Sequence, residues 1–173
     1  MNDICHMNQK GDGYMITQPT QSLFHKVPFG YSSMTNIPAI PQSHLDLLQQ
    51  PIVVVLATVM PSGQPQVNCV WCLYDGTHLR LFTWRGTQKE RNLREPPQAT
   101  ILVIDPQNPY CYIEIRGTVE EVTPEGAEEL ADQLTQRYVN QPTFFGHVEP
   151  EEKRNKMELV ACKIKPVRVV TYG

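Results

Sequence analysis

The sequence lacks a hydrophobic run long enough to cross a bilayer. Its longest apolar stretch, Ile52 to Met60, ends at the turn residues Pro61-Ser62-Gly63, and it is far shorter than the roughly 18 apolar residues that a membrane helix needs. The N-terminal residues also lack the basic start and apolar core of a secretory signal. We therefore expect a cytoplasmic protein with no membrane partner.

An excess of positive charge is also absent. The formal net charge is −3, which argues against a nucleic-acid partner, because affinity for a phosphate backbone depends on an excess of lysine and arginine. Positive charge is nevertheless concentrated within ten residues, at Arg85, Lys89, Arg91 and Arg94. This segment is therefore a candidate site for a small anion.

Patterns of metal ligands are missing as well. The chain has five cysteines, and the only close pair is Cys69 and Cys72. The pair falls in a predicted strand, where residues three apart point to opposite faces, and no second pair completes a zinc site. The histidines show no metal-ligand spacing either. We expect no metal site, and we interpret the two cysteines as independent strand residues.

The length of 173 residues is typical of one domain with a sizeable core. Residues 1–35 are rich in Gln, Asn, Ser, Thr and Gly without a sustained period, and we expect them to form a flexible N-terminal tail. Residues 36–173 are expected to form the folded domain.

Short β-branched and aliphatic runs between turn residues predict a mainly β (α+β) fold, an antiparallel six-stranded barrel with peripheral helices. The strands are expected at residues 52–60, 64–74, 78–84, 99–104, 111–122 and 159–172. Helices are expected after Ser43 as a cap, at 87–94, after the cap Thr123 with Pro124 at the first position, and at 150–157.

The most informative segment is LFTWRGTQKERNL, residues 81–93. A strand ends on Thr83, Gly86 permits a tight turn, and Thr87 with Glu90 has the spacing of a capping box. A phosphate beside Thr83, Thr87 and Lys89 would find both hydrogen bonds and positive charge at the helix start. The alternative is that Thr87 and Glu90 only cap the helix and that Lys89 is a solvated surface charge.

Four segments together resemble the pyridoxamine-phosphate-oxidase-like flavoproteins. They are PSGQP at 61–65, QVNCVWCLYDG at 66–76, LFTWRGTQKERNLREPPQATILVI at 81–104 and YIEIRGTVEEVT at 112–123. The most specific part is T-x-x-G-[ST]-x-K, carried by Thr83, Gly86, Thr87 and Lys89. The resemblance extends over residues 40–173 and implies a split barrel that dimerises and binds a flavin, usually FMN, in a groove between the subunits.

The resemblance also implies roles for particular residues. Lys89 would pair with the cofactor phosphate, Phe82 and Thr83 would contact the ring and the phosphate, and Gln88 stands where the oxidase proper usually has an arginine. The residues implied at the cofactor are Asn68, Cys69, Val70, Trp71, Phe82, Thr83, Trp84, Thr87, Gln88, Lys89 and Tyr112.

The resemblance to the oxidase proper fails at its substrate site. Its substrate-binding lysine would fall at Cys72 or Leu73, and its C-terminal basic motif is missing from KPVRVVTYG. We therefore expect a homodimeric FMN-dependent oxidoreductase that acts on an unidentified small molecule, and we identify no catalytic side chain. The alternatives are a reductase that uses the deazaflavin coenzyme, and a non-enzymatic flavin or haem carrier in which His147 would be the candidate haem ligand.

Overall fold

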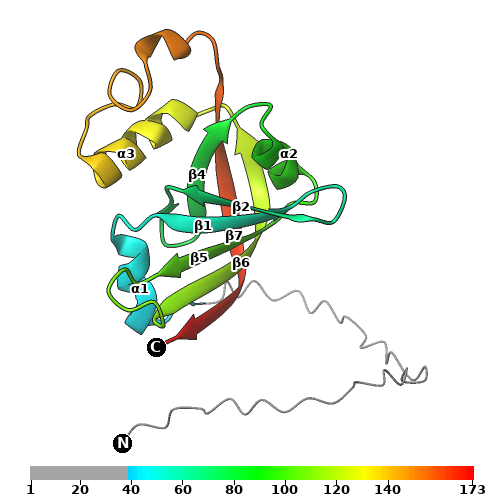
Figure 1. The fold of residues 1–173 in the computed structure, drawn as a ribbon, viewed down its shortest axis with the longest axis vertical. Coiled ribbons are helices and arrows are strands. Elements are labelled where there is room, and N and C mark those ends of the chain that lie inside the picture. The colour runs from blue at the N-terminus through cyan, green and yellow to red at the C-terminus, as the bar shows by residue number, and fades with distance from the viewer. Residues whose placement is uncertain (1–38) are drawn as a thin grey trace, which may run out of the picture. The chain divides into compact units, whose positions relative to one another are not determined.

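A computed structural model describes residues 39–173 of the chain. The predicted tail at 1–35 lies outside the described residues. The described part contains a seven-stranded antiparallel sheet, three α-helices and one 3-10 helix (Figure 1). In chain order these are α1 (Gln42–Gln49), β1 (Val54–Val59), β2 (Pro65–Val70), β3 (Leu73–Tyr74), β4 (Leu79–Trp84), α2 (Gln88–Arg94), β5 (Gln98–Ile104), β6 (Tyr112–Thr123), α3 (Ala127–Val139), η1 (Glu151–Lys153) and β7 (Leu159–Tyr172).

The sheet is ordered β2-β1-β5-β6-β7-β4-β3. The strands at its two ends, β2 and β3, are consecutive in the chain, so residues 65–74 join the two ends of the sheet. The predicted split-barrel class is therefore confirmed, with seven strands in place of the six that the sequence predicts. The difference arises because the predicted strand at 64–74 leaves β1 after Val70 and pairs with β4 from Leu73 onward.

The break at Trp71 and Cys72 is stabilised by a side chain of α3. The hydroxyl of Tyr138 accepts the Cys72 N–H at 3.2 Å and lies 2.9 Å from the carbonyl oxygen of Ile52. Burial raises the pKa of this phenol, so it stays protonated and can donate. One side chain thus supplies hydrogen bonds that a neighbouring strand would otherwise make.

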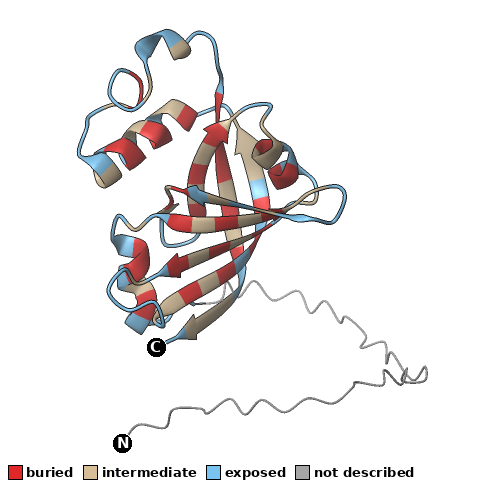
Figure 2. Ribbon diagram, in the orientation of Figure 1, coloured by how far each residue is buried: buried red, intermediate tan, exposed pale blue. Residues whose placement is uncertain are grey.

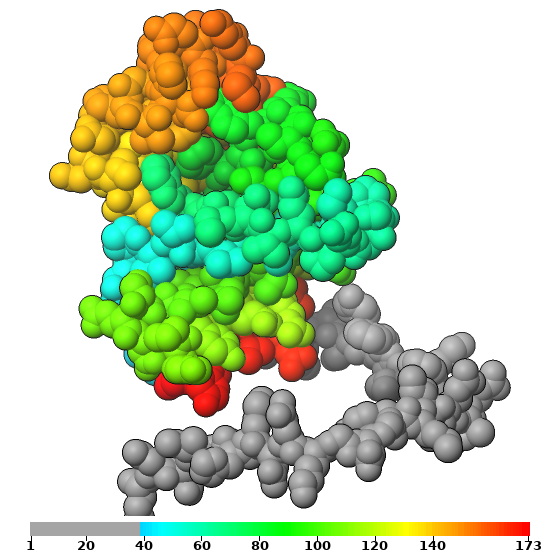
Figure 3. All heavy atoms as spheres, in the orientation of Figure 1, coloured from blue at the N-terminus to red at the C-terminus, as the bar shows by residue number. Residues whose placement is uncertain are grey.

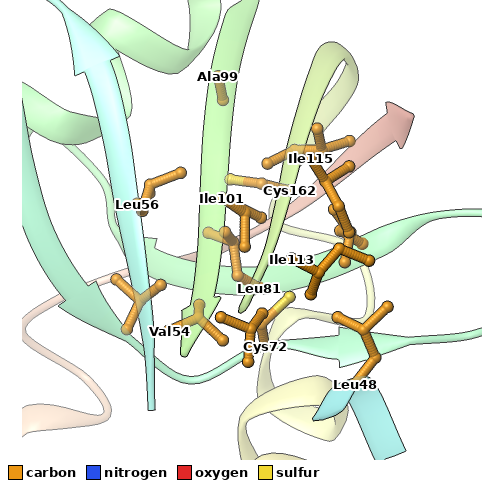
Figure 4. Packing of buried hydrophobic residues seen from close by; sticks show 14 of the residues in the cluster. Leu48, Val54, Leu56, Cys72, Leu81, Ala99, Ile101, Ile113, Ile115 and Cys162 are labelled. Atoms are coloured by element: carbon orange, nitrogen blue, oxygen red, sulfur yellow. The ribbon is translucent and has the colours of Figure 1, made fainter. Parts of the chain in front are cut away.

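Alternation along the strands separates an inner from an outer face of the sheet. In β1, Val54, Leu56 and Thr58 are buried while their neighbours are half-exposed, and Figure 2 shows the same banding on the other strands. The inward side chains of β1, β4, β5, β6 and β7 pack together with the α1 residue Leu48 (Figure 4). Cys162 is fully buried in this core, as its alternation with Lys163 predicts.

A second buried cluster lies between α3 and the segment that precedes β7. It contains Leu130 and Leu134 of α3 together with Phe144 and Phe145. In Figure 3 this yellow and orange segment lies beside the green atoms of β4, and Phe82 of β4 packs against the cluster. The cluster brings a loop from late in the chain next to the strand that carries the T-x-x-G-[ST]-x-K pattern.

Three predicted features of the helices are wrong. Ser43 does not cap α1: the cap position is Pro41, and the Ser43 hydroxyl bonds the ring of His44 at 2.8 Å. Thr123 does not cap α3, which begins after Gly126, because the Thr123 hydroxyl bonds Glu125 instead. The helix expected at 150–157 is reduced to the three-residue 3-10 helix at Glu151–Lys153.

Within residues 39–173, no helix is both long and apolar enough to span a membrane.

Candidate functional site

The turn between β4 and α2 forms largely as the sequence predicts. Thr87 is the N-cap of α2, and its hydroxyl accepts the Glu90 N–H at 3.3 Å. The Glu90 carboxylate reaches back to the Gly86 N–H at 3.3 Å, one residue before the N–H that a capping box would use. Gly86 has φ of 77°, a left-handed conformation that glycine adopts without strain.

The capped helix itself is a weak anion site. It has only seven residues, and the buried Glu90 carboxylate, paired with Arg94, places negative charge at its start. An anion in this region must therefore be bound by side chains rather than by the helix terminus.

A cavity of about 420 Å³ lies where β2, β4, α2 and the loop after α3 meet. It is lined by Val53, Cys69, Val70, Trp71, Phe82, Thr83, Trp84, Lys89, Phe144 and Val148. Its volume is within the range of sites for small molecules and cofactors. The cavity thus brings together seven residues that the sequence analysis assigns to the cofactor: Cys69, Val70, Trp71, Phe82, Thr83, Trp84 and Lys89.

Aromatic rings make up much of the cavity wall, and neighbouring side chains fix their orientation. Trp71 stacks on Tyr138 with ring centroids 5.2 Å apart and planes 16° apart. Phe82 meets Phe144 edge to face at 4.9 Å. Such contacts add to the energy of burial and restrict rotation of the rings. The wall therefore offers fixed apolar surfaces that suit a planar ring.

Lys89 is the cation of this cavity. Its side chain is half-buried, and burial lowers its pKa below the ordinary lysine value. Among residues 39–173 no carboxylate lies within ion-pair distance of its ammonium group, whereas Arg85 pairs with Glu158 and Arg94 with Glu90. A half-buried ammonium without a counter-ion favours an anionic ligand. The buried hydroxyl of Thr83 lines the same cavity.

Four predicted site residues do not line the cavity: Asn68, Thr87, Gln88 and Tyr112. The hydroxyl of Thr87 bonds the carbonyl oxygen of Trp84 as well as capping α2. Tyr112 stacks on Tyr172, with ring centroids 5.7 Å apart. The Asn68 Oδ1 atom is buried without a hydrogen-bond partner among the described residues.

Gln88 bonds side chains of its own helix and does not line the cavity. Its amide nitrogen donates to Asn92 Oδ1 at 2.7 Å, and its amide oxygen accepts from Arg91 at 2.9 Å. The side chain at the position where the oxidase proper usually has an arginine is therefore bonded within the protein, and the nearby cation Arg85 pairs with Glu158.

Sequence reasoning missed three lining residues: Val53, Phe144 and Val148. Val53 and Val148 are exposed hydrophobic residues, at 51% and 41% of their surface. Phe144 and Val148 lie in the loop after α3, whose fold carries no motif. The pair Phe144-Phe145 was an available indication, since two aromatic residues in a loop must pack against something.

The cysteine pair and His147 lie in different surroundings. Cys69 is an exposed residue of β2, whereas Cys72 is buried in the break between β2 and β3, where the predicted strand is interrupted, and burial raises the pKa of Cys72 to about 12. No group of three potential metal ligands occurs among residues 39–173. His147 is an exposed loop residue that bonds Thr143 at 2.9 Å and does not line the cavity.

Comparisons with known proteins agree with this architecture. The family model of pyridoxamine 5'-phosphate oxidase matches residues 40–172. A solved structure named F420 reductase is 36% identical, covers 76% of this chain and 98% of its own, and superposes with a TM-score of 0.65. No curated protein sequence matches the chain.

Two more distant structures share the fold. Rv2991 from Mycobacterium tuberculosis is 22% identical, covers 78% of this chain and 85% of its own, with a TM-score of 0.61. The haem storage protein HutZ from Vibrio cholerae is 15% identical, covers 76% and 93%, with a TM-score of 0.57. The family match over residues 40–172 and the 36% identical relative agree, and the chain belongs to the pyridoxamine 5'-phosphate oxidase family.

Proposed function

We propose that this chain is an oxidoreductase that binds a flavin-type cofactor in the cavity between β2, β4 and α2. The observation that carries the proposal is the half-buried Lys89, without a counter-ion in the described chain, in a cavity whose other walls are largely aromatic and aliphatic. A flavin-type cofactor has a matching construction, since it joins a planar ring to a phosphate.

The chemical types of the lining residues match the two parts of such a molecule. Trp71, Val70 and Phe82 offer apolar surface for the ring, while Lys89 and the Thr83 hydroxyl offer a charge and a hydrogen bond for the phosphate. When bound, the cofactor supplies hydride transfer at its ring, and the protein supplies binding, orientation and electrostatics. No carboxylate and no imidazole line the described cavity. The chain's own contribution is therefore to bind the ring and to exclude water from it.

The charge of the phosphate group itself fits the deazaflavin coenzyme better than FMN. The described lining residues include one cation, Lys89, because Gln88 is neutral and Arg85 is paired elsewhere. A phosphate monoester such as that of FMN carries about 1.5 to 2 negative charges at neutral pH, whereas the phosphodiester of the deazaflavin coenzyme carries one. The 36% identity to an F420 reductase supports the same choice. This reverses the order of the two cofactors that the sequence predicts.

The test uses the tryptophans as reporters. The chain has two tryptophans, Trp71 and Trp84, and both line the cavity. Binding of the deazaflavin coenzyme should quench most of the tryptophan emission, because both indoles would lie near the ring. The variants Trp71→Phe and Trp84→Phe, each with one remaining indole, should both show the quenching. Free tryptophan amide titrated in parallel corrects for absorption by the ligand.

If a separate measurement shows that the cofactor binds saturably, but neither indole is quenched, the cofactor binds outside this cavity. No quenching by the deazaflavin coenzyme together with saturable quenching by FMN would keep the cavity and change the cofactor.

We further propose that a second copy of the chain covers the outer face of the sheet. Val55 pairs directly with Cys69 on β2 and with Leu102 on β5, so the outward row is apolar across these three strands. Val67 is exposed over 60% of its surface. Contiguous exposed apolar surface marks interaction sites, and a two-fold copy presents the same surface. The face is continuous with the cavity, because Val53 and Cys69 line its rim.

Placing a charge on this face should separate the copies. We expect Val67→Lys to convert a dimer into a monomer, because the new lysine would bury an unpaired ammonium in the interface. Light scattering after size exclusion measures the mass. The matched variant Gln133→Lys, on the exposed side of α3, should leave the mass unchanged. A dimer that survives Val67→Lys at micromolar concentration would exclude this face as the interface.

A further inference from the structure

The two sides of the cavity are not joined directly by strand pairing. Cys69 and Val70 belong to β2, whereas Phe82 and Thr83 belong to β4, and five places separate β2 from β4 in the sheet order. α2 bridges this separation. It follows β4 after three residues and contacts β1 and β6 as well as β4.

Asn92 joins α2 to the far side. Its side chain is fully buried, and its amide nitrogen donates to Thr58 Oγ1 at 3.2 Å and to Gln66 Oε1 at 3.0 Å. Thr58 and Gln66 are directly opposite each other in the β1–β2 ladder. Both amide hydrogens of Asn92 are therefore used to attach the helix to one cross-strand pair.

The same side chain fixes the first turn of α2. Asn92 Oδ1 accepts from Gln88 at 2.7 Å, and Gln88 in turn accepts from Arg91, which also donates to the carbonyl oxygen of Gly86. This chain of hydrogen bonds runs from the β1–β2 pair to the residue that precedes Lys89. Its inner part, from Thr58 to Asn92, is buried, and a buried polar group with all its hydrogen bonds made permits one arrangement and penalises others.

We infer that Asn92 is a positioning residue that sets the place of Lys89 at the phosphate end of the cavity. It contacts no cavity surface itself; it fixes the height and rotation of α2 on the β1–β2 pair, and Lys89 follows Gln88 on the same turn. The inference rests on the proposed function, because it gives Lys89 a phosphate to bind.

The experiment compares ligands with and without the phosphate. FMN and riboflavin differ by the phosphate alone, whereas the deazaflavin coenzyme differs from deazariboflavin by its whole phosphodiester-linked tail. Affinities of the wild type and of Asn92→Leu are measured for FMN against riboflavin and for the deazaflavin coenzyme against its phosphate-free deazariboflavin. Loss of the three hydrogen bonds of the Asn92 side chain should weaken the phosphate-bearing member of the bound pair about tenfold more than its phosphate-free partner. The matched control is Thr135→Val, since Thr135 is fully buried in α3 with a hydroxyl that has no described partner. Its affinity ratio should equal that of the wild type.

An equal loss for both members of a pair, or no loss, in a folded Asn92→Leu protein would overturn the inference. If thermal unfolding shows that Asn92→Leu does not fold, Thr58→Val and Gln66→Leu each remove one hydrogen bond and must change the same ratio. Failure of the proposed function is distinguishable, because the wild type would then show no preference for phosphate-bearing ligands.

Discussion

Lys89→Ala is expected to weaken the binding of the phosphate-bearing cofactor by roughly 10- to 100-fold, since a charge-assisted hydrogen bond in a partly buried site contributes about 1.5 to 3 kcal/mol. The affinity for the phosphate-free ring should change by less than about twofold, because the aromatic wall made by Trp71 and Phe82 is untouched. Fluorescence titration of the two ligands measures both values.

The control is Lys156→Ala, which removes an exposed lysine outside the cavity. It should leave both affinities unchanged. Equal losses for the two ligands in Lys89→Ala would contradict a phosphate role and would indicate a packing role for the lysine stem instead.

The pH dependence of binding provides an independent check on Lys89. Burial lowers the pKa of its ammonium in the free protein, so the positive charge is lost below the pH at which an ordinary lysine deprotonates. Affinity for the phosphate-bearing cofactor should therefore fall at a lower pH than binding to an ordinary lysine would. In Lys89→Arg the fall should be absent, because a guanidinium remains charged throughout this range. If the affinity of the wild type does not change with pH, the charge of Lys89 does not contribute to binding of the cofactor.

Most of the secondary structure and seven of the ten residues that line the cavity could be predicted because they depend on local patterns. Alternation predicts β4 and β6, and Asp75-Gly76 predicts the hairpin between β3 and β4. The turn at Gly86 and the cap at Thr87 are local as well. The position of Lys89 in the cavity follows from these elements, because a short turn leaves little freedom between strand and helix.

The remaining features depend on contacts between distant parts of the chain. The break at Trp71 and Cys72 is made by Tyr138, 66 residues later, and Phe144 reaches the cavity through a loop without a motif. The hydrogen bonds that hold Gln88 within α2 depend on Asn92, whose buried contacts with β1 and β2 no local pattern predicts. Periodicity within one element carries no information on such contacts.

The apolar composition of β1 and β5 indicates more than the presence of two strands. β1 reads VVLATV and β5 reads QATILVI, so apolar residues occupy both alternating positions. A strand with one face in water usually alternates apolar and polar residues, whereas a continuous apolar run indicates that both faces are covered. The runs that predict the strands thus also support the outer docking face that includes Val55 and Leu102.

Gly117 is the position where a single methyl group should cost the fold most. A Cβ atom added there would lie 2.5 Å from the Cγ2 atom of Ile164 and 2.8 Å from the carbonyl oxygen of Lys165. The register between β6 and β7 shifts at this point, from Arg116 opposite Arg168 to Gly117 opposite Pro166. The shift brings the two backbones too close for a side chain.

The backbone contact decides the size of the effect. A flexible side chain could rotate away from a new methyl group, but Ile164 is fully buried and the Lys165 carbonyl belongs to the ladder itself. Overpacking of a filled core costs about 1 to 3 kcal/mol, and a forced backbone shift adds to it. We expect Gly117→Ala to lower the free energy of unfolding by about 3 kcal/mol and the melting temperature by about 10 °C. Gly117→Val should not yield the folded barrel.

Comparison with Gly63→Ala distinguishes two ways in which replacing a glycine destabilises the fold: a steric clash with neighbouring atoms and an unfavourable backbone conformation. Gly63 lies in the exposed turn between β1 and β2 with φ of +84°, and an added Cβ there meets no atom within 4 Å. Its substitution costs only the left-handed conformation, about 1 kcal/mol. Gly117→Ala should therefore be clearly the more destabilising of the two in urea unfolding. Equal effects would mean that β6 and β7 can move apart at the register shift, and that the ladder on which β4 and the cavity depend is less rigid than its packing implies.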